Sequence, residues 1–391
     1  MFIMQVKDLE EALLRCMKCG ECQAVCPSFS VTRRESEAAR GKVHLIKALC
    51  EGELKPSKAL VDRLSTCLLC KACSATCPSG VKVDQLIIAA REELVNKLGL
   101  PLYKMVFFRL LEHPGIIPLG MWCAKLLGLL PRQLPSPKKP FRRQVSSRAK
   151  LRNPRSKVVF FAGCMINYAY PEVGIAVMDV LNKGGFEVEV KEEKCCGIPA
   201  LYSGDVERAR ANAESNLKNF TGDETIVTAC PTCALAWKEY PKLLTGEAQK
   251  KASELASKTF EISDFFLKYN RKELGDIGTT LTYHQPCHLT YGLGVRHEPR
   301  ELVRLIGKGE YVEIEDKCCG FGGLFSYEHP EIVEKINDEK IDDIAESGAE
   351  LVVTPCPGCK YQINAGLKRR GLSKRTLHTA ELLSMAVKSG G

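Results

Sequence analysis

Two hydrophobic patterns divide the chain near Lys157. Beyond it, short apolar runs of strand length alternate with longer amphipathic stretches, and residues 158–161 are the first such run. The stretch 172–182 then has helical periodicity and stops at Gly184 and Gly185. Predicted strands lie at 158–161, 186–190, 226–227, 281–283, 311–314 and 351–353. This alternation predicts an α/β fold built on open sheets.

The first hundred residues are predicted to be helical. Residues 36–49 are rich in Ala, Glu, Lys and Leu, which favour helices, and residues 1–15 read as a short helix. Pro56 suits the first turn of a helix that reaches Leu64. Asp84 is placed to cap a further helix. The apolar stripe of that helix comprises Leu86, Ile87, Ala90, Leu94 and Leu98.

The stretch 102–130 is the most apolar part of the chain. Its apolar side chains include Met105, Val106, Phe107, Phe108, Leu110, Leu111, Ile116, Ile117, Leu119, Met121 and Trp122. Charged residues and three prolines cut it into short helices, and no run of 18 apolar residues occurs anywhere, so no membrane-spanning helix is predicted. Either the stretch docks a partner or a membrane surface, or it packs over the rest of the protein. Packing is favoured, because apolar side chains usually serve a core.

A repeat unites the α/β half of the chain. The pentapeptide Glu-Lys-Cys-Cys-Gly at 193–197 returns 123 positions later, at 316–320, as Asp-Lys-Cys-Cys-Gly. Cys164 precedes Cys287 by the same distance, and the Cys-Pro-Thr-Cys at 230–233 is matched at 356–359 by Cys-Pro-Gly-Cys. Three anchors in one order and at nearly one period predict a duplicated unit.

Twenty cysteines in 391 residues decide the class of chemistry. A chain of this length predicts two or three domains. The first eleven residues include three acidic ones and no apolar core of a secretory signal, so we expect a reducing compartment, the cytoplasm. Cysteine pairs in such a compartment indicate metal binding rather than a disulfide framework.

The formal net charge of +9 is confined to one window. Residues 131–157 hold ten basic residues and no acidic one, while the rest of the chain has 46 basic and 47 acidic residues. The ten are Arg132, Lys138, Lys139, Arg142, Arg143, Arg148, Lys150, Arg152, Arg155 and Lys157. A charge so localised does not indicate a nucleic-acid-binding face. With its prolines, the window reads as an extended linker, either a solvated tether or a contact for an anionic surface.

Two motifs of one spacing, Cys-x2-Cys-x2-Cys-x3-Cys-Pro, begin at Cys16 and Cys67. This spacing is typical of cubane [4Fe–4S] clusters, in which three thiolates come from one loop and the fourth from the other motif. We therefore expect one cluster on Cys16, Cys19, Cys22 and Cys77, and a second on Cys67, Cys70, Cys73 and Cys26. Zinc is the alternative, although structural zinc sites favour two separated cysteine or histidine pairs.

Each α/β repeat carries five further cysteines, just beyond the ends of predicted strands. These candidate metal ligands are Cys164, Cys195, Cys196, Cys230 and Cys233 in the first copy, and Cys287, Cys318, Cys319, Cys356 and Cys359 in the second. Open α/β sheets place their sites at the carboxyl ends of strands. Five thiolates exceed the four that a cubane needs, so the fifth either bridges irons in an opened, non-cubane cluster or is spare. A thiol- or zinc-based interaction scaffold is the remaining alternative.

These motifs together resemble a known family. The two four-cysteine motifs followed by two Cys-Cys-Gly (CCG) units resemble the iron–sulfur subunit of glycolate/D-lactate oxidases, and more distantly those of anaerobic glycerol-3-phosphate dehydrogenase and heterodisulfide reductase. The run at 72–81 and the Tyr-His-Gln-Pro-Cys-His-Leu at 283–289 share in the likeness. Its helical N-terminal domain resembles that of succinate dehydrogenase-type subunits. Both CxxC ends are complete here, as in heterodisulfide reductases, which keeps a catalytic non-cubane cluster open as the alternative function.

The resemblance implies an α+β multidomain fold with a pseudo-twofold pair of CCG units. The expected domains are a helical ferredoxin domain (1–100), an apolar helical segment and basic linker (101–156), and CCG units at 157–275 and 276–391. It implies two cubane [4Fe–4S] clusters, and one or two more in the CCG units. The chain would be an oxidoreductase subunit, inactive alone. Electrons would pass from a 2-hydroxy-acid dehydrogenase subunit to quinone, an electron-transfer flavoprotein or another carrier. Peripheral attachment to the inner face of the cell membrane is a further expectation.

Some residues remain open at this stage. No flavin or nicotinamide fingerprint occurs, so FAD is expected on the partner subunit only. His284 and His288 flank Cys287, where Phe161 and Met165 flank Cys164. Each histidine is either a structural residue or one that tunes a cluster or delivers protons. Two more cysteines, Cys50 and Cys123, match no motif and are expected to pack in the core.

Overall fold

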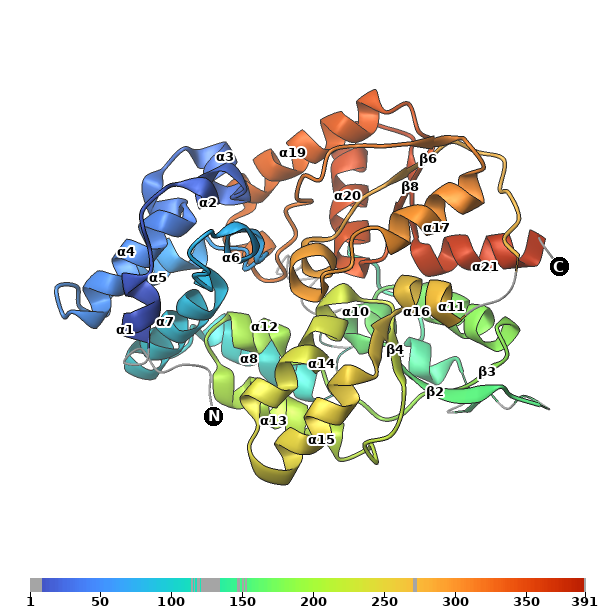
Figure 1. The fold of residues 1–391 in the computed structure, drawn as a ribbon, viewed down its shortest axis with the longest axis horizontal. Helices are drawn as coiled ribbons and strands as arrows, with labels where there is room; N and C mark the ends of the chain where they lie inside the picture. Colours follow the sequence, from blue (N-terminus) through green and yellow to red (C-terminus); the bar gives the residue numbers. More distant parts are fainter. Residues whose placement is uncertain are drawn as a thin grey trace.

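The N-terminal part of the chain is helical in the computed structural model, which describes residues 9–113, 115, 117, 120, 134–145, 148, 149, 151, 153–269 and 273–389 (Figure 1). Its helices are α1 (Glu10–Leu14), α2 (Glu21–Ala24), α3 (Pro27–Thr32), η2 (Glu35–Glu37), α4 (Ala39–Cys50), α5 (Lys58–Ser65), α6 (Ala72–Thr76) and α7 (Val83–Leu98). The helical prediction is confirmed in this described part. The short helices α2 and α6 carry the third cysteine of each four-cysteine motif, Cys22 and Cys73.

The N-termini of α5 and α7 differ from the sequence prediction. Helix α5 begins at Lys58, two residues after the Pro56 that was expected in its first turn, and Ser57 caps it by accepting a hydrogen bond from the Leu60 amide. The prediction that Asp84 caps α7 is wrong, because the helix begins one residue earlier and buries this carboxylate. Asp84 instead accepts hydrogen bonds from Ser74 Oγ at 2.5 Å and Lys71 Nζ at 2.6 Å. A buried carboxylate needs such partners, and here they tie the second cysteine motif to α7.

The first α/β unit is a five-stranded sheet in the order β1-β3-β2-β4-β5. Its strands are β1 (Arg148–Ala149), β2 (Ser156–Phe161), β3 (Phe186–Glu189), β4 (Ile226–Thr228) and β5 (Thr259–Glu261), and all neighbours are parallel except β1 and β3. Its helices are α10 (Gly163–Tyr168), α11 (Pro171–Lys183), α12 (Ile198–Tyr202), α13 (Val206–Leu217), α14 (Pro231–Leu243), α15 (Gly246–Ser257) and α16 (Ile262–Tyr269). The sequence pattern missed β1 and β5, which are only two and three residues long.

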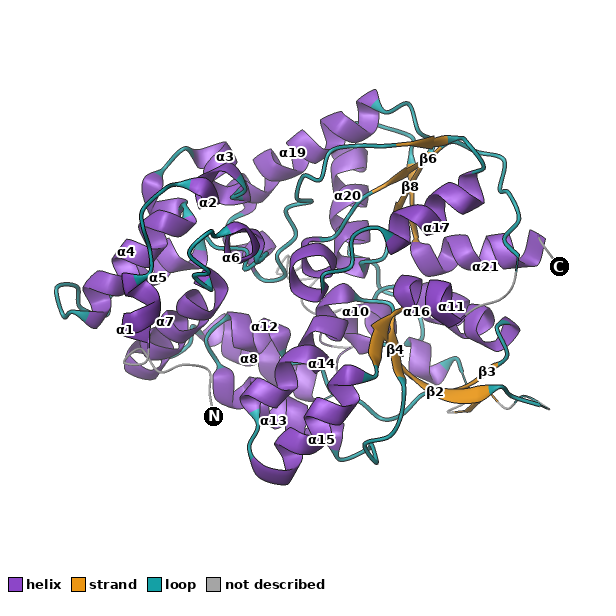
Figure 2. Ribbon diagram, in the orientation of Figure 1, coloured by secondary structure: helices purple, strands orange, loops and turns teal. Residues whose placement is uncertain are grey.

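The second unit repeats this topology in the order β7-β6-β8-β9, with every neighbour parallel. Its strands are β6 (Leu281–Tyr283), β7 (Tyr311–Val312), β8 (Leu351–Thr354) and β9 (Arg375–His378). Its helices are the π-helical turn η4 (His288–Gly292), α17 (Glu298–Gly307), α18 (Phe325–Glu328), α19 (Pro330–Glu346), α20 (Pro357–Arg369) and α21 (Thr379–Ser389). The mixed α/β architecture, with one mainly parallel and one fully parallel sheet, confirms the predicted fold class (Figure 2).

The three parts share cores rather than standing apart. Val180 of α11 packs in the core of the second unit, and Ala380 of α21 packs in the core of the first. Helix α7 and α8 (Leu102–Glu112) bury Leu94 and Phe108 in one cluster with Trp237 of α14. Because these clusters cross every boundary, the cysteine-bearing loops are held at fixed separations.

The apolar stretch after α7 has both buried side chains, as expected for packing in a core, and exposed ones, as expected for a docking surface. Phe108 and Ile117 are buried, as packing requires, whereas Leu102 of α8 is 72 % exposed and Val106 is 51 % exposed. Most of 114–133 lies outside the described residues. Among the described residues, no helix is long and apolar enough to cross a membrane.

The basic window (131–157) is anchored to the first α/β unit by Phe141. Over residues 140–145 the interpretation of this window as a solvated tether is therefore wrong. Phe141 is 0 % exposed and contacts Phe160 edge-on, with ring centroids 5.6 Å apart. Helix α11 makes room for the ring with Gly174, where a Cβ atom would lie 2.6 Å from it. The Arg142 amide also donates a hydrogen bond to Asn167 Oδ1 at 3.0 Å. Residues 131–133, 146, 147, 150 and 152 lie outside the described residues.

We expect Phe141→Ala to lower the free energy of unfolding by about 3–5 kcal/mol, because it removes a fully buried ring from a close-packed site. Anaerobic denaturant titration of the two proteins measures the difference. Arg143→Ala is the matched control two positions away, at an exposed side chain. An equal, small effect of both substitutions would show that the window is not anchored.

Candidate metal centres

The eight cysteines of the N-terminal motifs border two small cavities. One is lined by Cys16, Cys19, Cys22, Cys73 and Cys77, and the other by Cys26, Cys67, Cys70 and Cys73. Apart from Cys73, which lines both cavities, each cysteine lines the cavity of the set to which the motif spacing assigns it. Ligation of iron by each set remains a prediction.

The two cysteine loops share one unusual backbone geometry. Lys18 and Leu69, each two residues after the first cysteine of its motif, have φ of 60° and 54°. Gly20 and Lys71, two residues further on, have φ of 91° and 67°. Side chains other than glycine rarely adopt this left-handed region, and such strain tends to persist at functional sites. Two loops of unlike sequence with the same turns are suited to enclosing the same kind of group.

The electrostatics of the second cavity suit a metal cluster. Burial raises the pKa of the thiols of Cys26, Cys70 and Cys73, so bare thiolates would be unfavourable there. Bound metal cations reverse this cost because they stabilise the thiolates that coordinate them. Two cations lie nearby: the buried Lys42 donates to the Glu37 carbonyl at 2.6 Å, and the partly buried Arg91 donates to the Cys67 carbonyl at 2.9 Å.

Arg91 also joins the N-terminal domain to the first α/β unit. Its guanidinium donates to the carbonyls of Leu64 and Cys67 on one side and of Tyr202 in α12 on the other. Sequence reasoning missed this role, since an arginine within a helix normally faces water.

Nine of the ten candidate cysteines of the two α/β units line one cavity of about 840 Å³, and the tenth, Cys195, is buried but is not part of its lining. Its lining includes Cys164, Cys196, Cys230, Cys233, Cys287, Cys318, Cys319, Cys356 and Cys359, together with Cys67 from the N-terminal domain. Strands β2 and β6 end just before the first cysteine of each set, and β4 and β8 just before each CxxC motif. Parallel strands bring these ends to one edge of each sheet, and the two edges face each other.

The sulfur atoms within this cavity lie close enough to interact. The Sγ atoms of Cys319 and Cys359 are 3.2 Å apart. The thiols of Cys233 and, across the boundary between the units, Cys356 hold the pKa of Cys230 well below its usual range. The two CxxC motifs therefore meet, and the two cysteine sets form neighbouring centres. Convergent buried thiols are a donor set suited to iron–sulfur clusters.

Both Cys-Cys-Gly turns have the same supports. Gly197 and Gly320 each have φ of 87°, and a Cβ atom on Gly320 would lie 3.0 Å from the Val333 carbonyl oxygen. Two fully buried asparagines brace the turns: Asn216 donates to the Cys195 carbonyl at 3.4 Å, and Asn337 donates to the Cys319 carbonyl at 3.0 Å. Sequence reasoning missed both asparagines, although each lies on a helix that follows its Cys-Cys-Gly turn.

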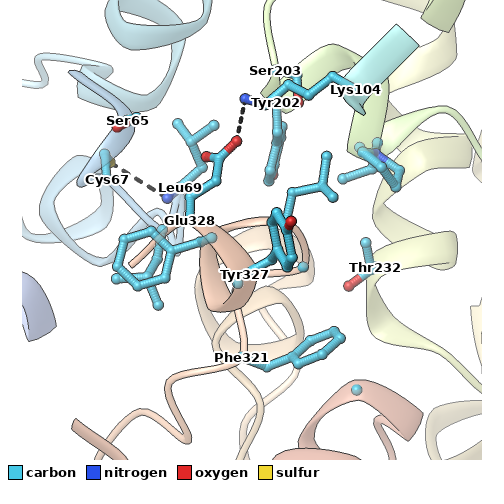
Figure 3. Close-up of a pocket in the computed structure, with 18 of the residues that line it drawn as sticks. Ser65, Cys67, Leu69, Lys104, Tyr202, Ser203, Thr232, Phe321, Tyr327 and Glu328 are labelled. Carbon is cyan, nitrogen blue, oxygen red and sulfur yellow. Dashed lines mark hydrogen bonds and ion pairs between the residues drawn. The ribbon is translucent and has the colours of Figure 1, made fainter. Parts of the chain in front are cut away.

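Part of the cavity wall is polar. Lys104 of α8 forms an ion pair of 2.5 Å with Glu328 of α18, and Tyr103 donates to the same carboxylate at 2.6 Å. Figure 3 shows this pair on one side, with Tyr202 and Tyr327 beside it and Thr232 across the cavity. Helix α8, from the apolar stretch, thus borders the candidate centre.

His288 connects the cysteine loops of all three parts of the molecule. It follows Cys287, its Nδ1 lies 2.9 Å from Thr232 Oγ1 within the first CxxC motif, and its Nε2 lies 3.3 Å from the Leu69 carbonyl. Burial lowers the pKa of His288 to about 4, so the ring is neutral near pH 7. A carbonyl only accepts, so Nε2–H donates to Leu69 and the Thr232 hydroxyl donates to Nδ1. The ring is therefore fixed in one tautomer between the three loops.

Three further residues singled out in the sequence are His284, Cys50 and Cys123. His284 lies at the end of β6 with its ring near Cys319 and Cys359. Cys50 ends α4 and packs, partly buried, against the large N-terminal core, as expected. Cys123 lies outside the described residues.

Comparison with known protein families agrees with this division of the chain. Residues 12–81 match the family described as 4Fe-4S dicluster domain. Residues 158–238 and 281–364 each match the family described as Cysteine-rich domain. The two cysteine-rich matches coincide with the two α/β units.

Several characterised or named proteins are similar in sequence to all or part of this chain. A probable glycolate oxidase iron-sulfur subunit of Bacillus subtilis is 28 % identical over 96 % of this chain and 94 % of its own length. A subunit of the fumarate reductase (CoM/CoB) of Methanothermobacter marburgensis is 29 % identical over 95 % of this chain and 72 % of its own. Lactate utilization protein A of a Geobacillus species is 36 % identical over 58 % of this chain and 99 % of its own.

A solved structure supports the fold alone. The crystal structure of a hypothetical protein from Helicobacter pylori aligns with 91 % of this chain and 69 % of its own, with a TM-score of 0.53 and 12 % identity.

We expect the anaerobically reconstituted chain to hold about sixteen irons if all four sites fill with four irons each. Cys318→Ser should remove one spectroscopic species and leave the two N-terminal clusters intact, because Cys318 lines only the shared cavity among those described. Iron and sulfide analysis with Mössbauer and EPR spectra measures this. Cys50→Ser is the matched control and should retain every species; stoichiometric zinc without iron would refute the cluster assignment.

Proposed function

The chain belongs to the CCG-domain family of iron–sulfur subunits that includes glycolate oxidase iron–sulfur subunits and lactate utilization protein A, and on that premise we propose a specific electron-transfer role. It takes electrons from a separate FAD-containing subunit that oxidises a 2-hydroxy acid, glycolate or D-lactate. It then passes them through its own sites to quinone, an electron-transfer flavoprotein or another carrier. Iron–sulfur clusters supply one-electron transfer in such a role.

One observation carries this proposal: the second N-terminal cysteine loop touches the shared cavity. Leu69 lies between Cys67 and Cys70, and its carbonyl accepts the hydrogen bond from His288, the neighbour of Cys287. Cys67 and Leu69 also line the cavity itself. Electrons that enter the N-terminal domain would therefore have a short, packed route of cysteine loops to both CCG centres.

Oxidation of a hydroxy acid needs a flavin or a nicotinamide, and the sequence shows no fingerprint for binding either. Such a reaction requires a base for the hydroxyl proton and a two-electron acceptor for the hydride. The two buried histidines at the cavity are held against loops and sulfur, and the sequence carries no flavin fingerprint. Hydride chemistry is therefore assigned to the partner, and the electrons reach this chain one at a time.

We expect the purified chain alone to show no cluster reduction with D-lactate or glycolate. Adding its flavoprotein partner should produce substrate-dependent bleaching of the visible cluster absorption. The matched control is the same mixture with Cys70→Ser, which should lose reduction of the CCG centres. Bleaching by either acid without a partner would refute the assignment.

A second function is favoured by the cavity. Its 840 Å³ could admit a small substrate between two complete cysteine sets, as a disulfide reductase of the heterodisulfide type would need. One relative, which is part of a fumarate reductase (CoM/CoB), fits this alternative. Rapid turnover of a disulfide by the reduced chain without a flavoprotein would select it.

His288 provides a test of the proposed route. His288→Leu removes the hydrogen bonds to Leu69 and Thr232, and we expect electron transfer from the N-terminal clusters to the CCG centres to slow about 10- to 100-fold, as for other groups that orient metal ligands. Stopped-flow reduction followed by freeze-quench EPR measures this. Met165→Leu, at the equivalent position of the first unit, is the control; unchanged kinetics in His288→Leu at full iron content would contradict the route.

The basic window offers a surface for peripheral association with an anionic membrane. Lys138, Lys139 and Arg143 are exposed, while Arg142 is held by the Lys191 carbonyl at 3.3 Å. A basic residue near such a surface contributes about 1 kcal/mol at best, screened by salt.

We expect the wild type to co-sediment with anionic vesicles at low salt and to dissociate as salt rises. Reversing Lys138, Lys139 and Arg143 to Glu should abolish this binding, while neutral vesicles bind neither protein. Equal binding of wild type and triple variant would show that the window is no membrane contact.

A further inference from the structure

The two CCG centres differ at one position that faces their sulfur atoms. The residue three positions before the first cysteine is Phe161 in the first unit and His284 in the second. Phe161 is the last residue of β2 and His284 directly follows β6, which are inner strands of their sheets, and both residues are buried. The duplicated fold therefore presents a hydrocarbon ring to one centre and an imidazole to the other.

His284 is held rigidly and its ring faces sulfur. Its backbone amide donates to the Val353 carbonyl of β8 at 2.8 Å, and the residue is 2 % exposed. One ring nitrogen and the sulfur atoms of Cys319 and Cys359 all lie within 4.8 Å of one another. In the described part of the chain, neither ring nitrogen has a nitrogen or oxygen hydrogen-bond partner.

A buried imidazole without a partner is costly, so the missing acceptor calls for an explanation. The sulfur atoms beside the ring supply one once they are thiolates bound to metal. Direct ligation of iron by His284 is not needed, because the second unit already offers five thiols to a cluster that requires four.

We propose that His284 donates a ring N–H hydrogen bond to the sulfur of Cys319 or Cys359 in the second CCG cluster, making this centre easier to reduce than the first. The inference rests on the proposed function, since it needs a cluster in the second unit. A donor directed at cluster sulfur stabilises the reduced, more negative state, and hydrogen bonds to sulfur are among the factors that set cluster potentials.

The first centre has no equivalent donor at this position. Phe161 packs edge-on against Trp237, with ring centroids 5.5 Å apart, and its ring can only exclude water. Because the cysteine sets otherwise match, this difference would make the two centres accept electrons in a defined order. The centre in the second unit would be reduced before the centre in the first unit.

The test is an EPR-monitored redox titration of the fully loaded chain. His284→Phe copies the first unit and should make the reduction equilibrium of the second centre about tenfold less favourable, a shift of about 59 mV to lower potential for one electron. His284→Gln retains an N–H donor and should stay close to wild type. The first centre should not move in either variant, which serves as the internal control.

Equal shifts in the Phe and Gln variants, or none in either, would overturn the inference. Proton ENDOR of the wild type gives a second readout, independent of whether a variant assembles its cluster. An exchangeable proton coupled to the second centre and missing from the first is the expected result, and a strong ¹⁴N coupling typical of iron–nitrogen bonding would contradict it. A second unit without any cluster would refute the proposed function itself, whereas a cluster with an unchanged potential would refute only the role of His284.

Discussion

The structure depends on how the negative charge of buried cysteine thiolates is compensated. Burial raises the pKa of Cys287 to about 12, and burial likewise raises the pKa of Cys70 and Cys73 well above its usual range. Thiols placed so deeply are poor thiolates on their own, and a protein gains little by burying them without a cation. Metal binding changes this balance, so the loops, the left-handed turns and the bracing asparagines all make sense as supports for clusters.

Rigidity is the second requirement, because electron transfer needs centres at fixed separations. Hydrophobic clusters cross from α7 and α8 into the first unit and between α11 and α21 of the two units. Polar links act at the same boundaries, as with Arg91 toward Tyr202 and His378 toward the Ala229 carbonyl at 2.8 Å. The domains expected from the sequence, whose boundaries remain a proposal, are therefore fused through their cores.

Duplication explains both the symmetry of the site and its useful departure from symmetry. Two copies of one unit supply matching cysteine sets, turns with the same φ and an asparagine behind each turn. Once two sites exist, a single substitution can make them unequal without disturbing either fold. Phe161 and His284 are such a difference, and His288 is another, since it reaches into both other cysteine loops.

Most of the elements, and the class of chemistry, could be predicted from patterns along the chain. Local spacing identified the two four-cysteine motifs, the period of the repeat identified the two α/β units, and hydrophobic patterns located six of the nine strands that the described residues contain. These properties are encoded by neighbours along the chain, so they can be recognised without coordinates. The pattern failed at β1, β5 and β9, which are too short or too mixed to stand out, and at Asp84, where a tertiary partner outweighed a local cap. Three contacts could not be predicted in this way: Cys230 beside Cys356, Leu69 against His288, and His284 facing sulfur. Each joins residues that are far apart in sequence. Their geometry therefore depends on how whole units pack in the tertiary structure.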